Sequence, residues 1–431
     1  MKEKRTIAAL AAVVMLSAAA AGAQQVPDSV ARRQQRQLDS LTAALKALEA
    51  RLDSVSRAGG GGSAAAASGG DELAALRAAA AAAAASGDSA AAAQPQTPKL
   101  GQNALNPEIS VTGDLRANAF NPGPQVNNFE AREFEFAFQS ALDPFATAKV
   151  IMSVSPEGAE VEEGYAYFTS LPAHLRLDVG RFRQLVGELN RWHGHALPED
   201  EYPLVIRRFA GDEGLKGNGV SLYSALPFQP LGGAYELTVQ ATAGDNEVLY
   251  LSSHRPSVNA QLAGFWQLSR STFAQLSGSG LYGTNPDSNF NTKLMIGAAR
   301  FTWRPPQQGQ ARELTIRGEY WALDRSVRDQ PAFSAGVPGF PLGTVKGWYG
   351  DASWKLNRRW TVTTRGDYAE SPELGAKAHE WAVVPSLTFW QSEFVYIRGI
   401  YEHHMDVLNQ KTNRLSMQVN FSMGPHKHEI F

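Results

Sequence analysis

The chain has 431 residues and a formal net charge of -2, and it contains no cysteine. The absence of a large basic excess argues against a nucleic-acid partner. The missing cysteine excludes disulfides, thiol catalysis and cysteine-ligated metal sites.

The N-terminus has the pattern of an export signal. Two Lys and one Arg within the first five residues precede a short apolar run, residues 7–16, and Ala21-Gly22-Ala23 supplies the small residues that signal peptidase recognises. We therefore predict a signal peptide over residues 1–23. No later run of about 18 apolar residues occurs, so a membrane-embedded chain would have to be a closed barrel rather than a helix bundle.

The next segment has the spacing of a coiled coil. Its apolar residues are separated by three and four positions, namely Leu38, Leu41, Leu45, Leu48, Leu52 and Val55. We predict a short α-helical coiled coil over residues 24–58, with a lone surface helix as the alternative. Residues 59–107 are rich in Ala, Gly and Ser, which predicts a disordered linker.

From residue 108 to residue 431 polar and apolar side chains alternate. Residues 109–118, 314–320 and 414–421 are examples, and such segments approach the 9–11 residues that a tilted strand needs to cross a bilayer. We predict an all-β transmembrane barrel of sixteen antiparallel strands. These begin near Ile109, Phe129, Phe145, Ala159, Leu175, Gly217, Ala234, Val258, Ser271, Thr292, Arg312, Thr344, Arg359, Ala378, Glu393 and Lys411. The alternation is less regular near Ala159, Thr292 and Glu393.

The connections between these segments alternate in length. Even-numbered ones are short, such as 142–144 and 356–358, whereas the odd-numbered ones include 184–216, 244–257, 323–343 and 403–410. Bacterial barrels have short periplasmic turns and longer external loops. A soluble sandwich, the alternative for the same alternation, has no reason to distribute its loops this way. Aromatic residues near strand ends, including Trp321, Trp348 and Trp360, fit the interfacial girdles of a barrel.

The longest external loop, residues 184–216, carries the clearest motif. Gly180-Arg181-Phe182-Arg183-Gln184, followed by Glu188 and by Arg207-Arg208-Phe209, resembles the phosphate-selective porin-like group of outer-membrane porins. The resemblance implies a trimeric sixteen-stranded channel, sometimes with a periplasmic coiled coil. The acidic run 199–201 departs from the dense basic ladder that phosphate specificity requires in that group, so we carry over the channel and not the phosphate substrate.

In general porins the third external loop folds inward and narrows the pore, and by analogy we expect the same here. Charged side chains at a constriction set ion preference. The expected constriction residues are Arg181, Arg183, Glu188, Arg191, Arg207, Arg208 and Glu213. The expected lumen-lining residues are Asp114, Arg116, Arg317, Glu319, Arg365 and Asp367. The alternative is a solvated loop held by Arg–carboxylate pairs.

The sequence gives less support to metal binding or catalysis. The pairs His193-x-His195, His403-His404 and His426-x-His428 could chelate Zn²⁺, but the sequence fixes no third or fourth ligand, and we predict no metal site. Glu162 and Glu163 are adjacent on a predicted strand and would face opposite sides unless a bulge intervenes. No G-x-S-x-G motif is present. We therefore expect neither an enzyme nor a cofactor.

The sequence thus predicts a porin-like channel in the bacterial outer membrane, with its N-terminal stalk in the periplasm. Small hydrophilic solutes or ions, including small anions, would diffuse through it passively. The expected partners are outer-membrane lipid, further copies of the chain in a homotrimer, and peptidoglycan through the coiled coil. The alternative is a structural protein that tethers the outer membrane to the cell wall.

Overall fold

The computed structural model describes residues 107–123, 128–172, 175–284, 291–309, 311–325 and 343–424. The predicted signal peptide and coiled coil, and the predicted linker up to residue 106, lie outside the described residues. Among the residues that are described, no helix is both long enough and apolar enough to cross a membrane.

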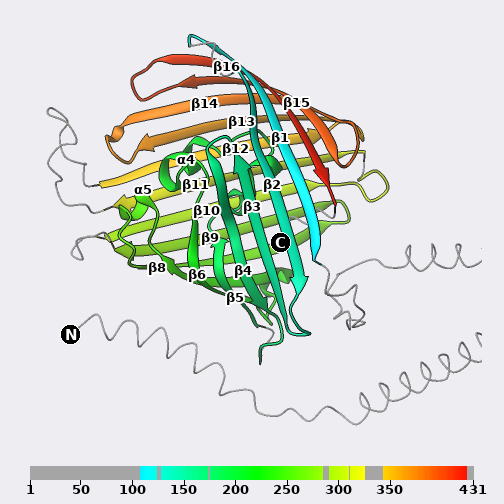
Figure 1. The fold of residues 1–431 in the computed structure, drawn as a ribbon, viewed down its shortest axis with the longest axis vertical. Coiled ribbons are helices and arrows are strands. Elements are labelled where there is room, and N and C mark those ends of the chain that lie inside the picture. The colour runs from blue at the N-terminus through cyan, green and yellow to red at the C-terminus, as the bar shows by residue number, and fades with distance from the viewer. Residues whose placement is uncertain are drawn as a thin grey trace, which may run out of the picture. The chain divides into compact units, whose positions relative to one another are not determined.

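Sixteen antiparallel strands form a closed barrel (Figure 1), in which each strand pairs with the next and the first pairs with the last. Their bounds are β1 (Glu108–Asn121), β2 (Phe129–Ala141), β3 (Ala146–Ser155), β4 (Gly158–Phe168), β5 (Leu175–Arg183), β6 (Lys216–Ala225), β7 (Ala234–Ala243), β8 (Pro256–Ser269), β9 (Thr272–Thr284), β10 (Asn291–Trp303), β11 (Glu313–Arg325), β12 (Gly343–Lys355), β13 (Trp360–Ser371), β14 (Gly375–Trp390), β15 (Val395–Met405) and β16 (Lys411–Met423). The predicted barrel and its strand number are confirmed. The largest difference in a strand start is at β14, which begins at Gly375 rather than near Ala378.

The barrel carries its polar side chains inside and its apolar side chains outside. On β13, Arg365 and Asp367 are buried while Trp360 and Val362 are exposed. Other exposed apolar side chains on the strands include Ile316, Trp348, Val383, Leu387, Ile397, Leu415 and Met417. A soluble sandwich would bury the apolar set, so the sandwich alternative is wrong. An apolar outer face is the face that a transmembrane barrel turns toward lipid.

A β-bulge changes the phase of β4. Ile151 of β3 pairs with Glu163, but the next residue, Met152, pairs with Val161, so Glu162 is the extra residue. As a result both Glu162 and Glu163 are buried. The bulge is the exception under which these neighbours can face the same side, and it also explains why the sequence alternates irregularly near Ala159.

Several strands are apolar on both faces. Leu294 and Ile296 of β10, like Trp321 and Leu323 of β11, are buried in the hydrophobic core. This double apolar pattern explains the irregular alternation near Thr292. Trp321 is fully buried and donates a hydrogen bond to Glu319, so its assignment to an interfacial girdle is wrong.

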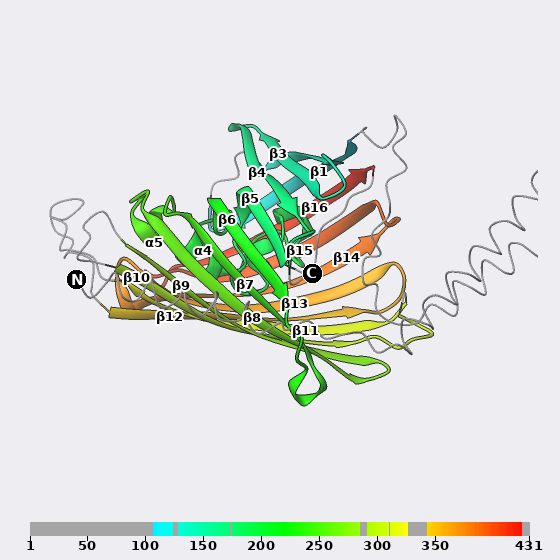
Figure 2. The same cartoon turned by 90° about the horizontal axis from the view of Figure 1, so that it is seen from below.

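The longest connections, including 184–215 and 244–255, are odd-numbered and lie at one end of the barrel, although the odd-numbered connections 156–157 and 372–374 are short. Figure 2 shows the strands in both walls of the barrel. The even-numbered connections include residues 142–145, 270–271 and 356–359, and the longest odd-numbered connection is residues 184–215. The connection predicted over 403–410 is shorter, residues 406–410, because β15 extends to Met405.

If the exposed apolar face lies against lipid, a charged side chain introduced on that face should lower the stability of the barrel. Met417→Arg on β16 should destabilise the barrel by about 2–4 kcal/mol in lipid vesicles if Met417 lies near the bilayer midplane. Leu408→Arg, in the exposed turn 406–410, is the matched control and should cost far less. Denaturant unfolding of both variants in vesicles measures the difference, and equal costs would contradict a lipid-facing position for Met417.

Candidate functional site

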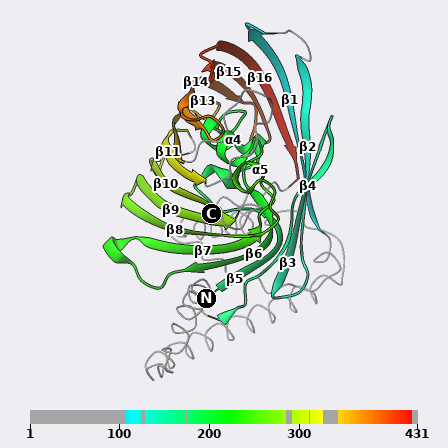
Figure 3. The same ribbon diagram turned by 90° about the vertical axis from the view of Figure 1, so that its left-hand side faces the viewer.

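The long connection between β5 and β6 folds into the barrel. It contains three short helices, η3 (Leu189–Arg191), η4 (Gly194–Ala196) and α4 (Leu204–Ala210). Figure 3 shows α4 among the strands, and α4 packs against β12, β13 and β14. We call residues 184–216, which are all described, the inner loop. Within the inner loop only Arg208, Asp212 and Glu213 are exposed.

Polar contacts tie the inner loop to strands around almost the whole barrel. Hydrogen bonds or ion pairs join it to β1, β2, β4, β7, β8, β9, β10, β11, β13, β14, β15 and β16. A loop that merely lined one wall would leave the opposite strands free. The inner loop therefore crosses the lumen and occupies much of it at this level.

An apolar contact holds one side of the inner loop. Val205, Ile206 and Phe209 of α4 are fully buried in a cluster with side chains of β9 to β15. A Cβ at Gly347 of β12 would lie 2.5 Å from Val205 Cγ2, so any larger residue there would push α4 away. Burial and close packing of these apolar side chains stabilise the position of the loop without requiring a particular bond geometry.

Buried ion pairs hold the other side. Asp200 accepts two hydrogen bonds from Arg414 of β16, at 2.5 and 3.0 Å, and lies 3.5 Å from Arg116 of β1. Glu199 accepts a hydrogen bond from Arg365 of β13 at 2.9 Å. Burial alone would raise the pKa of Asp200. The charges of Arg414 and Arg116 lower the pKa by more than burial raises it, so it falls well below its usual range. Asp200 therefore stays ionised at neutral pH.

Glu319 of β11 fixes the start of η3. Its Oε1 accepts hydrogen bonds from the backbone N–H groups of Glu188 and Leu189, at 2.9 and 3.0 Å, and from the Tyr349 hydroxyl at 2.7 Å. Gly187 has a φ of 62°, and a Cβ there would lie 2.0 Å from Glu319 Oε2. Only glycine satisfies both the positive φ and the close approach.

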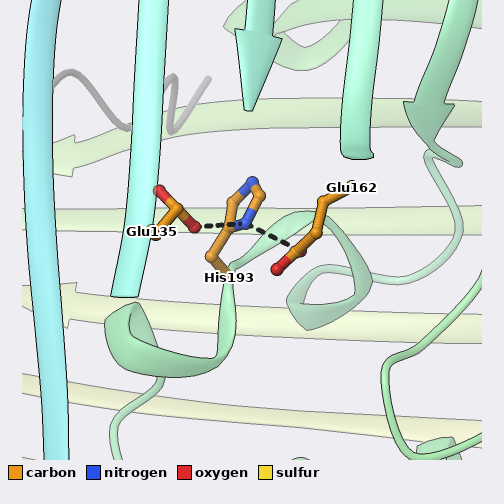
Figure 4. Close-up of side chains that lie close together, drawn as sticks. All are labelled: Glu135, Glu162 and His193. Atoms are coloured by element: carbon orange, nitrogen blue, oxygen red, sulfur yellow. Dashed lines mark ion pairs between the residues drawn. The ribbon is translucent and has the colours of Figure 1, made fainter. Parts of the chain in front are cut away.

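A third contact centres on His193. Its Nδ1 lies 2.8 Å from Glu135 Oε2 and 3.2 Å from Glu162 Oε2 (Figure 4), while its Nε2 lies 2.8 Å from Glu163 Oε1. Arg183 donates to Glu162 and, at 2.9 Å, to the Tyr202 hydroxyl. Burial lowers the pKa of His193, but the Glu135 carboxylate raises it well above the usual range. The sequence singled out His193 and Glu162–Glu163 separately, and the bulge in β4 brings them together.

The predicted constriction arginines are paired with carboxylates. Arg207 donates to Glu201 at 2.7 Å, and Arg208 donates to both oxygens of Glu380 on β14. Arg181 lies 3.2 Å from Glu160 on β4. These arginines therefore present much less free positive charge than the sequence suggested. The alternative interpretation, a solvated loop held by Arg–carboxylate pairs, describes these pairs correctly, although the inner loop is mostly buried.

The other predicted constriction residues occupy different environments. Glu188 accepts a hydrogen bond from Arg300 of β10 at 3.0 Å. Arg191 ends η3 and is partly buried. Glu213 has an exposed side chain that binds Lys216, and its carbonyl accepts a hydrogen bond from Arg183 at 2.6 Å.

The six predicted lumen-lining residues point into the barrel but contact protein. They are at most 7% exposed, namely Asp114, Arg116, Arg317, Glu319, Arg365 and Asp367. Besides the contacts already given, Arg317 bonds Asp351 at 3.1 Å and lies over the Trp192 ring, 4.9 Å from its centroid. Asp114 lies 3.2 Å from Arg132. At this level they bind the inner loop and each other instead of lining an open channel.

A pocket of about 450 Å³ lies beside the exposed part of the inner loop. It is lined mainly by polar side chains of both signs, namely Asn118, Phe120, Glu130, Glu201, Leu204, Arg207, Arg208, Asp212, Glu380, Glu402, His404, Thr412 and Arg414. The sequence analysis did not include Glu380, Glu402 or Arg414 among its site residues. Glu380, Glu402 and Arg414 lie on β14, β15 and β16 at positions whose side chains the period-two alternation turns inward. This alternation was the sequence signal that could have identified them.

The comparisons with known sequences give little information about the chain. No family model matches the chain. An uncharacterized protein of Aquifex aeolicus is 33% identical over 128 residues, and the match spans 29% of this chain and only 26% of that protein. Its short span leaves the family open.

Solved structures resemble the barrel at low sequence identity. The anion-selective porin of Comamonas acidovorans has a TM-score of 0.51 and 9% identity, covering 74% of this chain and 100% of its own. OmpT, an outer membrane protein of Vibrio cholerae in its trimer form, has a TM-score of 0.50 and 9% identity, with 74% and 100% covered. OmpF of Salmonella typhi, in complex with daunomycin, has a TM-score of 0.50 and 10% identity, with 74% and 99% covered. The chain therefore has the porin barrel fold.

The ion pairs of Asp200 predict that its charge holds the inner loop in place. Asp200→Asn should loosen the loop, because it removes the carboxylate through which the loop pairs with Arg414 and Arg116. Breaking a buried ion pair costs about 3–5 kcal/mol, and the cost here should lie at the low end because Arg414 keeps Glu402 and Arg116 keeps Asp114. The chain has no cysteine, so Asp212→Cys provides one site for a spin label whose mobility can be measured in the folded barrel. Asp245→Asn, in the connection 244–255, is the control. Equal label mobility in the two variants would show that Asp200 is not an anchor.

Proposed function

We propose that the chain is a porin-like channel of the bacterial outer membrane that carries small hydrophilic solutes or ions by passive diffusion. The observation that carries this proposal is a closed barrel with an apolar outside, a charged inside and a long loop folded between them. Only a closed barrel or a helix satisfies its backbone hydrogen bonds in lipid. No catalytic role is part of this proposal.

Conduction through this barrel requires the inner loop to move. The described conformation leaves the predicted lumen-lining residues at most 7% exposed, so it corresponds to a closed or very narrow state. The loop is held by ion pairs, hydrogen bonds and one apolar contact, each of which can break without unfolding the strands. A ligand or a change of conditions that favours the displaced loop would then raise conductance.

Selectivity would arise at the pocket beside Arg207 and Arg208. Charges of both signs lie there, and paired charges set a transverse field that distinguishes ions by sign. Within the porins, we propose that the chain belongs to the phosphate-selective porin-like group, which the motif around Gly180-Arg181-Phe182 supports. Because the arginines are paired, this pocket supports small ions or dipolar solutes and gives no particular support to phosphate.

The remaining parts of the proposal concern the surroundings of the barrel. The apolar outer face favours outer-membrane lipid as its environment. The resemblance to porins favours a homotrimer, and the heptads between Leu38 and Val55 favour a periplasmic stalk that reaches peptidoglycan.

A structural tether is the second candidate, and the filled lumen favours it. If the inner loop never leaves the barrel, the strands would serve as an anchor and the stalk would carry the function. The two candidates differ in conductance and in the effect of removing the stalk.

Replacing residues 188–213 with a short Gly-Ser linker should raise single-channel conductance severalfold in planar bilayers, because it removes the material that fills the lumen. Folding of the variant is checked by its heat-dependent mobility on gels. Deleting residues 32–57 is the control and should leave conductance unchanged. A folded barrel that conducts in neither form, together with loss of envelope attachment on deleting 32–57, would favour the tether.

Arg208→Gln should shift ion preference toward cations, because it leaves the Glu380 carboxylate without its bidentate partner at the pocket. Reversal potentials in a salt gradient measure the shift. Arg358→Gln, in the exposed turn 356–359, is the matched control and should change nothing. An identical reversal potential in Arg208→Gln and the wild type would remove Arg208 from the selectivity filter.

A further inference from the structure

Three side chains from distant parts of the sequence converge inside the barrel. Glu135 belongs to β2, Glu162 to β4 and His193 to the inner loop (Figure 4), and one ligand atom from each lies within 4.8 Å of the other two. We propose that these three residues form a binding site for a divalent transition-metal ion of the Zn²⁺ type.

The distances between these ligand atoms are slightly shorter than a bound ion would set. Ligands bound tetrahedrally to Zn²⁺ at ~2.0–2.2 Å lie about 3.3–3.6 Å apart. The Nδ1 of His193 lies 2.8 Å from Glu135 Oε2 and 3.2 Å from Glu162 Oε2. A small rotation of the two carboxylates admits the ion. One imidazole nitrogen with two carboxylate oxygens favours Zn²⁺ and related ions over Ca²⁺ or Mg²⁺, which prefer oxygen ligands alone.

The orientation of the imidazole supports the same assignment. Glu163 Oε1 lies 2.8 Å from His193 Nε2, on the far side of the ring from Glu135 and Glu162. A carboxylate that holds one ring nitrogen of a ligating histidine fixes the tautomer and aims the other nitrogen at the metal. The bulge in β4 is what makes this possible, because it brings Glu162 and Glu163 to the same histidine.

A buried oxygen gives an independent indication. Glu135 is 2% exposed, and its Oε2 is held by an ion pair with His193 whose geometry is poor for a hydrogen bond. Two imidazole nitrogens face this oxygen, His193 Nδ1 at 2.8 Å and His195 Nδ1 at 3.5 Å. Buried carboxylate oxygens normally satisfy their hydrogen-bonding capacity, and a cation would do so here. His195 is the nearest side chain to supply a fourth ligand.

The local charge also favours a cation. Four carboxylates, those of Glu133, Glu135, Glu162 and Glu163, face three permanent cations, those of Arg132, Lys149 and Arg183. Without a metal the proton on His193 balances the remaining negative charge, and a bound ion would replace that proton and leave the imidazole neutral. Arg183 donates a hydrogen bond to Glu162 Oε2, the same oxygen that would bind the proposed ion. A carboxylate oxygen has two lone pairs, so Oε2 can serve both.

The ligands bridge the inner loop and the barrel wall, so a bound ion would fasten the loop to β2 and β4. This consequence is separate from the transport of solutes, and the site can be tested by binding alone whether or not the barrel conducts.

The experiment measures metal binding to the full mature chain, folded in detergent and freed of metal with a chelator. The C-terminal histidines could bind zinc themselves, so every variant carries His426→Asn and His428→Asn. Zn²⁺ is titrated by calorimetry, with heat-dependent gel mobility as the folding check. We expect about one equivalent of Zn²⁺, with affinity at least tenfold weaker in His193→Gln and in Glu135→Gln.

His403→Asn, a partly buried histidine on β15, is the matched control and should bind Zn²⁺ like the background chain. Co²⁺ provides a second measurement that does not depend on variants, because four-coordinate Co²⁺ absorbs visible light far more strongly than hydrated Co²⁺. A chain that binds no Zn²⁺ and gives only the hydrated Co²⁺ spectrum would overturn the proposal and leave His193 as a protonated partner of its carboxylates. Undiminished Zn²⁺ binding in His193→Gln would also overturn it.

Discussion

Charges that point into a closed barrel need partners, and this constraint organises the whole structure. Strands that turn their apolar face outward must turn Arg116, Arg365 and Arg414 inward. An isolated buried charge costs several kcal/mol unless an opposite charge or hydrogen bonds compensate it. The inner loop supplies Glu199 and Asp200 to these arginines, so the loop and the wall satisfy each other.

The inner loop is attached by two different kinds of contact. Its helix α4 presents Val205, Ile206 and Phe209 to an apolar patch on β9 to β15, where the barrel interior departs from the polar pattern. Charged residues of the loop make ion pairs with β1, β2, β4, β10, β13, β14 and β16. Apolar contacts hold over a wide range of conditions, whereas ion pairs respond to protons, salt and bound ions. The polar side is therefore the side on which loop movement would be controlled.

Two irregular pairings in the first strands of the barrel place charged residues near the inner loop. Beyond the bulge at Glu162, the register between β1 and β2 shifts at Asp114, which leaves Arg132 as an extra residue. Both extra residues carry charge, and both contact the charged groups around the inner loop. Bulges re-aim side chains, and here they turn Arg132 and Glu162 toward the charged groups around the inner loop.

The sequence by itself determined the parts of this protein that depend on neighbouring residues. Period-two alternation places side chains on opposite faces of a strand, and this local rule sufficed to predict all sixteen strands and the inward position of Asp114 or Arg365. It also marked residues 184–216 as the exceptional loop.

Only the tertiary structure decided what that loop does. The partners of Asp200 are Arg116 and Arg414, far away along the chain in opposite directions, and no local pattern encodes such a pairing. The same holds for His193 with Glu135 and Glu162, where a bulge also breaks the alternation on which the sequence argument relied. Arg116 and Arg414 meet around Asp200 because closure of the barrel pairs β1 with β16, and side chains from the first and last strands come together only once the ring of strands is complete.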